Sequence, residues 1–108
     1  MYIYNITINI DDANHAIWLV WIENHIHRIL DTKKFTSAKM TEVMVDNESG
    51  RTYSIQFVAS SKAELIAFQE NYENDFRLQA YRKFGDKMMF FTTELKLIKE
   101  FFASSIIN

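Results

Sequence analysis

The chain of 108 residues is long enough for one hydrophobic core and leaves no room for a second. Its acidic and basic residues are interspersed and sum to a net charge of -2, so a nucleic-acid partner, which selects for a basic surface, is not expected. The absence of cysteine excludes disulfides, a thiol nucleophile and thiolate metal ligands.

The first segment of the chain alternates between apolar and polar side chains. The even positions are apolar: Tyr2, Tyr4, Ile6, Ile8 and Ile10. The odd positions Asn5, Thr7 and Asn9 are polar. A period of two is typical of a β-strand with one buried face, so we predict a strand over residues 2–10.

The same segment lacks the basic start, the apolar run and the cleavage site of a secretory signal. The longest apolar run, Ala16 to Ile22, is too short to cross a bilayer. We therefore expect a cytoplasmic protein without a membrane partner.

A helix is predicted next, from Ala13 to Leu30, with Asp11 and Asp12 providing its N-cap and negative charge at its start. At about 100° per residue, one face of this helix carries Trp18, Trp21, Ile22, His25 and Ile29. The two tryptophans on this face are interpreted as core residues.

Two strands, Phe35 to Val45 and Thr52 to Ala59, are separated by the turn-forming residues 46–50, which predicts an antiparallel hairpin. In the second of these strands Tyr53, Ile55 and Phe57 point to one face of the sheet. Thr52, Ser54 and Gln56 point to the other face.

A capping box at residues 61–64 opens a second helix, which we expect to end near Tyr81. Its apolar stripe consists of Leu65, Phe68, Tyr72 and Phe76. Gly85 is expected to have a positive φ before a last strand over residues 87–97.

The order of these elements is β-α-β-β-α-β, which predicts an α+β, ferredoxin-like domain over residues 1–98. Its sheet has four antiparallel strands, and two helices cover one face. Residues 99–108 form an apolar tail with Phe101, Phe102, Ile106 and Ile107. We expect this tail to dock on its own domain or on a second subunit, because a solvated end is rarely so apolar.

Several segments taken together resemble a known family. They are residues 3–7 (IYNIT), 18–22 (WLVWI) with 25–26 (HI), 35–39 (FTSAK), 52–57 (TYSIQF) and 83–87 (KFGDK). In order and spacing this set resembles the domain-of-unknown-function family 4286, a family of small Bacteroidetes proteins. The resemblance covers roughly residues 1–97 and implies a plan similar to dimeric α/β-barrel proteins, in which two ferredoxin-like subunits pair sheet against sheet. It implies no activity.

His25 is the candidate catalytic residue because a titratable ring lies in the middle of an apolar helix face. It is interpreted either as an acid–base group beside a cleft or as a core histidine held by a hydrogen bond. No metal site is predicted, because His25 and His27 face opposite sides of a helix. No motif for a cofactor is present.

The candidate ligand-binding residues lie on the polar faces of the strands: Asn5, Thr7, Asn9, Ser54 and Gln56. In a ferredoxin-like fold the helices leave one face of the sheet open, and these side chains would line it. Their amides and hydroxyls could orient a small ligand between two subunits. Alternatively, they bond one another and water within an interface.

Two functional hypotheses follow. The first is a non-enzymatic homodimer that binds a small molecule or a protein partner. The second is an enzyme similar to cofactor-independent dimeric-barrel monooxygenases or isomerases, with His25 as the acid–base group and Asn5, Thr7 and Gln56 holding the substrate on the open face. The second hypothesis requires the His25 ring to reach a cavity.

Overall fold

The computed structural model of the protein describes residues 1–46 and 49–104. The elements are β1 (Tyr2–Ile10), the 3-10 turn η1 (Asp12–Asn14), α1 (His15–Leu30), β2 (Ser37–Val43), β3 (Arg51–Ala59), α2 (Lys62–Asn71), α3 (Glu73–Phe84), the 3-10 turn η2 (Gly85–Lys87) and β4 (Met88–Lys96). The predicted N-cap of the second helix is confirmed, since the Ser61 side chain accepts from the backbone N–H of Glu64. Asp11 caps the 3-10 turn η1, where its side chain accepts from the backbone N–H of Asn14, and α1 begins at His15 instead of the predicted Ala13.

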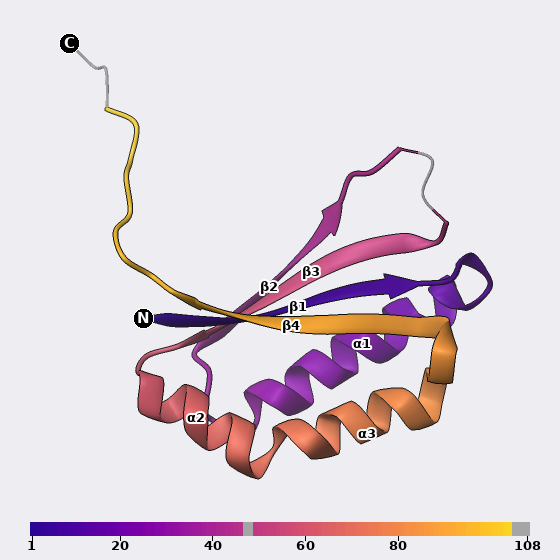
Figure 1. The fold of residues 1–108 in the computed structure, drawn as a ribbon, viewed down its shortest axis with the longest axis horizontal. Coiled ribbons are helices and arrows are strands. Elements are labelled where there is room, and N and C mark those ends of the chain that lie inside the picture. Colours follow the sequence, from indigo (N-terminus) through magenta and orange to yellow (C-terminus); the bar gives the residue numbers. More distant parts are fainter. Residues whose placement is uncertain (47–48, 105–108) are drawn as a thin grey trace.

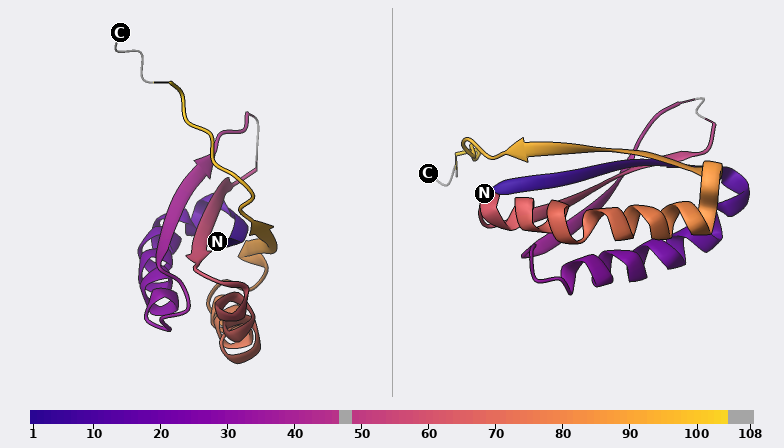
Figure 2. Two further views of the ribbon diagram at one scale, coloured as in Figure 1. Left: turned by 90° about the vertical axis from the view of Figure 1, so that its left-hand side faces the viewer. Right: turned by 60° about the horizontal axis from the view of Figure 1, so that its bottom comes forward.

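One antiparallel sheet has the strand order β2-β3-β1-β4. β1 lies inside it, with Ile10 opposite Arg51 on one side and opposite Met88 on the other. All helices lie against one face of the sheet, and the opposite face is open (Figures 1 and 2). The predicted α+β, ferredoxin-like arrangement is therefore confirmed.

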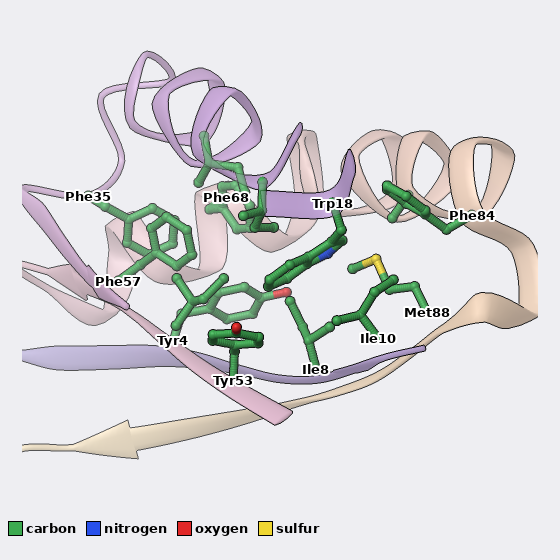
Figure 3. Packing of buried hydrophobic residues seen from close by; sticks show 14 of the residues in the cluster. Tyr4, Ile8, Ile10, Trp18, Phe35, Tyr53, Phe57, Phe68, Phe84 and Met88 are labelled. Carbon is green, nitrogen blue, oxygen red and sulfur yellow. The ribbon is translucent and has the colours of Figure 1, made fainter. Parts of the chain in front are cut away.

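The core fills the space between the helices and the covered face of the sheet. The even residues of β1 and the odd residues of β3 point into it, as their alternation predicts, and Tyr4, Ile8 and Phe57 are almost fully buried. At one end the rings of Tyr4, Phe35, Phe57 and Phe68 contact one another (Figure 3), with centroid separations of 4.8–6.4 Å. Such aromatic contacts stabilise the layer beyond the area they bury.

The prediction of a single second helix was wrong. The backbone leaves helical geometry at Tyr72 (φ -129°, ψ -31°), and a separate helix, α3, begins at Glu73. The flanking residues Asn71, Asn74 and Asp75 are weak helix formers and favour a bend here. The bend lets two straight helices follow the twisted sheet, so that Phe68 on α2 and Phe84 on α3 are both buried.

The hairpin is also shorter than predicted. Phe35 is buried in the aromatic cluster instead of pairing with β3, and the first link to β3 is the hydrogen bond from the backbone N–H of Thr36 to the carbonyl of Val58. β2 then runs only to Val43. Part of the predicted turn, residues 47–48, lies outside the described residues.

The chain leaves the sheet soon after β4. The backbone N–H of Leu97 donates to the carbonyl of Met1, and the chain then extends away from the domain (Figure 1). Ile98 is exposed, and Phe101 and Phe102 are each 83% exposed. Ile106 and Ile107 lie outside the described residues. Among the described residues, no helix is both long and apolar enough to cross a membrane.

We expect Gly50→Ala to destabilise the domain more than Gly85→Ala. Both glycines have positive φ, 80° and 56°, a backbone conformation that residues with a Cβ rarely adopt, so alanine at either position should destabilise the domain. At Gly50 a Cβ would also stand 2.5 Å from the carbonyl oxygen of Ile10, whereas at Gly85 no described atom lies within 4 Å. Urea unfolding should therefore show a loss of at least ~2 kcal/mol for Gly50→Ala. Equal losses would contradict the close approach of the hairpin to β1.

Candidate functional site

A cavity lies between the helices and the covered face of the sheet. Its walls come from β1, β4, α1 and α3, and most are apolar: Ile6, Ile8, Ile22, Ile29, Phe76 and Ala80. Its polar lining consists of His25, Tyr4, Glu73, Arg77 and Thr92. The cavity has a volume of about 30 Å³, which is room for about two water molecules. Small-molecule sites usually have volumes of roughly 300–1,000 Å³, so a molecule larger than water would enter this cavity only if the surrounding side chains moved.

His25 is held in this wall by aromatic side chains. Its ring is stacked on that of Trp21, with centroids 4.3 Å apart, and it meets the ring of Phe76 edge to face at 5.2 Å. The residue is only 5% exposed. A guanidinium nitrogen of Arg28 lies 3.3 Å from Nδ1. Burial first, and the positive charge of Arg28 second, lower the pKa of His25 to about 4.

Three polar side chains join α3 to the sheet at the edge of the cavity. The Tyr4 hydroxyl donates to Oε2 of Glu73 at 2.6 Å, and Oε1 of Glu73 lies 3.8 Å from Nε of Arg77. Burial and the hydrogen bond to the carboxylate of Glu73 raise the pKa of Tyr4, so the phenol stays protonated. Arg77 also donates to the Thr92 hydroxyl and lies over the ring of Phe90, 5.9 Å from its centroid. Arg77 therefore spans from α3 to β4 beside the cavity.

The sequence analysis did not single out these residues. Glu73 and Arg77 are four residues apart, the spacing at which opposite charges meet on a helix, and this signal could have drawn attention to them. Tyr4 was assigned to the core, which is correct for its ring. Its hydroxyl bonds to Glu73, the first residue of α3 after the bend at Tyr72.

The predicted ligand-binding residues lie together on the open face. Ser54 Oγ donates to Asn5 Oδ1 at 2.6 Å, and Asn5 Nδ2 donates to Thr7 Oγ1 at 3.1 Å. Asn9 Nδ2 donates to Thr52 Oγ1 at 3.2 Å. Gln56 lies directly opposite Asn5 on the neighbouring strand. Asn5 and Asn9 on β1 therefore bond across to Ser54 and Thr52 on β3, and Asn5 also bonds to Thr7 within β1.

His25 does not join this set. Asn5, Thr7 and Gln56 point to the open face, whereas His25 lines the cavity with Ile6 and Ile8, which point to the covered face. The sheet separates the two groups, so the structure offers two separate candidate sites. Among the described residues, no three His, Asp or Glu side chains come together as metal ligands do.

The family comparison covers most of the chain. Residues 1–98 match the family model described as Domain of unknown function (DUF4286). No curated protein matches the chain.

Solved structures share the fold. A dimeric ferredoxin-like protein from an uncultured marine organism superposes with a TM-score of 0.70 at 13% identity, over 93% of this chain and 97% of the other. A proposed antibiotic biosynthesis monooxygenase from Deinococcus radiodurans has a TM-score of 0.62 at 9% identity, over 97% and 100%. A proposed monooxygenase from Shewanella loihica has a TM-score of 0.58 at 8% identity, over 92% and 96%. At these identities the likeness shows the fold alone.

Acid should destabilise the wild type more than a His25→Leu variant. The pKa of His25 is about 4 in the folded state, below its ordinary value of 6.5, so the unfolded chain takes up a proton first. The contribution of the neutral His25 to the free energy of unfolding is fully present above pH 6.5 and is lost as the pH falls toward 4. The free energy of unfolding should fall by about 3 kcal/mol over this range.

Urea unfolding of both proteins between pH 7 and pH 4 checks this expectation. His27→Leu is the matched control, because His27 is exposed on the same helix and should leave the pH dependence unchanged. If His25→Leu and the wild type lose stability in parallel, the buried imidazole does not cause the effect.

Proposed function

Since the chain belongs to the DUF4286 family of unknown function, we propose a function from its geometry: the protein is a non-enzymatic binding domain that forms a homodimer through the open face of its sheet. Two sheets that meet face to face lie about 10 Å apart. The side chains of the two open faces then form the interface.

The observation that carries this proposal is the hydrogen bonding of the open face. Asn5, the central amide, is 9% exposed and bonds to both Ser54 and Thr7. Polar groups that are already paired lose little when water is removed, whereas unpaired groups would oppose burial. The face is therefore suited to being covered by a second sheet.

Apolar side chains on the same face supply the driving force. Met89 and Phe91 stand beside Asn9 and Thr7 in the register of β1 and β4, and they are 68% and 63% exposed. Leu95 and Val43 are exposed at the two edges of the same face. Met89 and Phe91 lie next to each other on β4, whereas Asn9 and Thr52 separate them from Val43. Large exposed apolar side chains that lie together are typical of an interaction site. The structural neighbour that is described as a dimeric ferredoxin-like protein supports the same arrangement.

The proposal extends to the tail. Residues 99–104 are exposed, and no described residue of the domain covers Phe101 or Phe102. Of the two docking sites expected for the tail, a second subunit is the one that this geometry favours. The tail then adds apolar contact to the dimer from the end of β4.

We expect Phe91→Lys to disrupt the dimer. The wild type should have a mass twice 12.8 kDa in sedimentation and native mass spectrometry. Because Phe91 is mostly exposed in one subunit, the lysine should leave the fold intact while placing a charge in the interface. We expect the dissociation constant to rise at least ~30-fold.

Val20→Lys is the control, since Val20 is 67% exposed but lies on α1, on the other side of the sheet. It should leave the dimer unchanged. A monomeric wild type at tens of micromolar, or equal weakening by the two lysines, would contradict the proposed interface.

A second candidate function rests on the position of His25 in a cavity. A neutral imidazole in an apolar hollow can assist proton removal from a substrate, and two structural neighbours are described as proposed monooxygenases. In a cofactor-independent monooxygenase or isomerase of this kind, the pocket is the helix–sheet cavity, and Asn5, Thr7 and Gln56 take no part because they face the opposite side.

Oxygen uptake with 1-naphthol, without added metal or flavin, tests the enzyme hypothesis. Oxygen oxidises naphthol to 1,4-naphthoquinone with one oxygen atom entering the ring and the other leaving as water. An enzyme that uses His25 should lose this activity in His25→Phe and keep it in His27→Phe. Absence of uptake, or uptake that His25→Phe leaves unchanged, argues against a monooxygenase with this substrate class.

A further inference from the structure

A groove runs along the helix layer, between α1 and α3. The two helices lie side by side (Figures 1 and 2), and Trp21 of α1 meets Phe84 of α3 edge to face, with ring centroids 5.2 Å apart. Two hollows, of about 520 Å³ and 560 Å³, lie along this line, and both are lined by Trp21 and Lys83. Each hollow therefore has room for side chains of a bound molecule, which the helix–sheet cavity lacks.

The first hollow is mainly apolar. Ile17 and Val20 line it and are 57% and 67% exposed, and Ala16 and Trp21 extend the apolar lining. Ile17 and Trp21 are four residues apart and lie on one face of α1. Neither Ile17 nor Val20 belongs to the hydrophobic core. Packing within the domain therefore leaves two large aliphatic side chains uncovered in this hollow.

The second hollow is basic. Besides Trp21 and Gln79, it is lined by three exposed cations: Arg28, Arg82 and Lys83. No carboxylate lines either hollow, and none of the three cations forms an ion pair among the described residues. In a chain with a net charge of -2, this hollow is thus a local site for negative charge.

The order of these residues along the groove limits the partner. Ile17, Trp21 and Arg28 follow one face of α1 over about 16 Å, so a partner must present apolar side chains first and carboxylates after them within about three helical turns. The groove offers only side chains, and a helix satisfies its own backbone hydrogen bonds, which an extended segment here could not do.

The pairing of α1 with α3 also suits a helix. The two helices run antiparallel, and the side-chain ridges of a third helix can pack into the groove between such a pair. A flat lipid surface would instead contact the outer ridges of the two helices, whereas the cations and apolar side chains line the hollows between them.

We propose that the groove between α1 and α3 binds an acidic amphipathic helix of a protein partner. Apolar side chains of that helix contact Ile17 and Trp21, and its carboxylates pair with Arg28, Arg82 and Lys83. The groove is on the opposite side of the sheet from the proposed dimer face. This inference goes beyond the proposed dimer and stands or falls independently of it.

A set of synthetic helical peptides tests the proposal. Each has about four turns, held helical by a side-chain cross-link, with leucines along one stripe. The peptides differ only at one end of the stripe, which carries a pair of glutamates, glutamines or lysines. Dissociation constants come from tryptophan fluorescence, because Trp21 lines both hollows. Shifts of backbone amides in ¹H–¹⁵N spectra locate the bound peptide.

The glutamate peptide should bind the wild type at least ~10-fold more tightly than the lysine peptide, with the glutamine peptide between them, because its carboxylates meet unpaired cations. Added salt should reduce the difference. Ile17→Lys should weaken binding of the glutamate peptide through loss of apolar contact. Lys83→Glu should lower the preference for glutamate at least ~3-fold. The matched control Lys62→Glu, at an exposed lysine of α2, should leave the preference unchanged.

Equal affinities of the wild type for the glutamate and lysine peptides would overturn the proposal, as would failure of all the peptides to bind at millimolar concentration. Equal effects of Lys83→Glu and Lys62→Glu would place the peptide elsewhere and also overturn it. The comparison of peptides on the wild type needs no variant, so it decides the question even if a variant does not fold.

Other occupants of the groove give different results. Binding to phosphatidylglycerol vesicles that Ile17→Lys abolishes, in a protein that binds none of the peptides, would assign the groove to a membrane surface. An assembly of the wild type larger than a dimer that Ile17→Lys disperses would assign it to a second copy of the chain. Either result would overturn the proposal.

Discussion

Each side chain of β1 can point to only one face of the sheet, and β1 is hydrogen-bonded to a strand on both of its edges. Its tyrosine and isoleucine side chains therefore lie on the helix side, and its asparagine and threonine side chains lie on the open side. A shift of one residue in register would exchange the two sets and expose the core. The cavity and the open face both depend on this one alternation.

The polar side chains on the two faces of the sheet have hydrogen-bond partners in different parts of the fold. On the open face, the amide of Asn5 finds partners in Thr7 and Ser54 within the sheet itself. On the covered face, Tyr4 bonds to Glu73 from a helix nearly seventy residues away in the chain, and among the described residues His25 has a hydrogen-bonding neighbour, Arg28, at one of its ring nitrogens. The polar groups of the open face thus bond within the sheet, whereas on the covered face the indole Nε1 of Trp18 is buried without a hydrogen-bond partner among the described residues.

The fold could be predicted from the sequence because the alternation of β1 and the caps at Asp11 and Ser61 are local signals. The bend at Tyr72 could not be predicted from the sequence, since neither proline nor glycine marks it and the apolar stripe from Phe68 to Phe76 continues through it. The sequence predicted that His25 lies on the apolar face of the first helix, and the structure buries it there, while its catalytic role stays a prediction. The separation of His25 from Asn5 could not be predicted, because it depends on the side of the sheet against which α1 packs. The surroundings of the His25 ring depend on Phe76, a residue of another helix.

The strand order has a consequence for synthesis of the chain. β1 is made before the other strands, but one of its two neighbours is β4, which begins only at Met88. On the ribosome, β1 therefore keeps one edge without a strand until residues 88–96 have emerged, and an open strand edge of this kind attracts other chains. The pairing of such distant segments also slows folding, because a long loop must close before the contacts form. β1, an inner strand of the sheet, thus completes its backbone hydrogen bonds only after the last strand has been made.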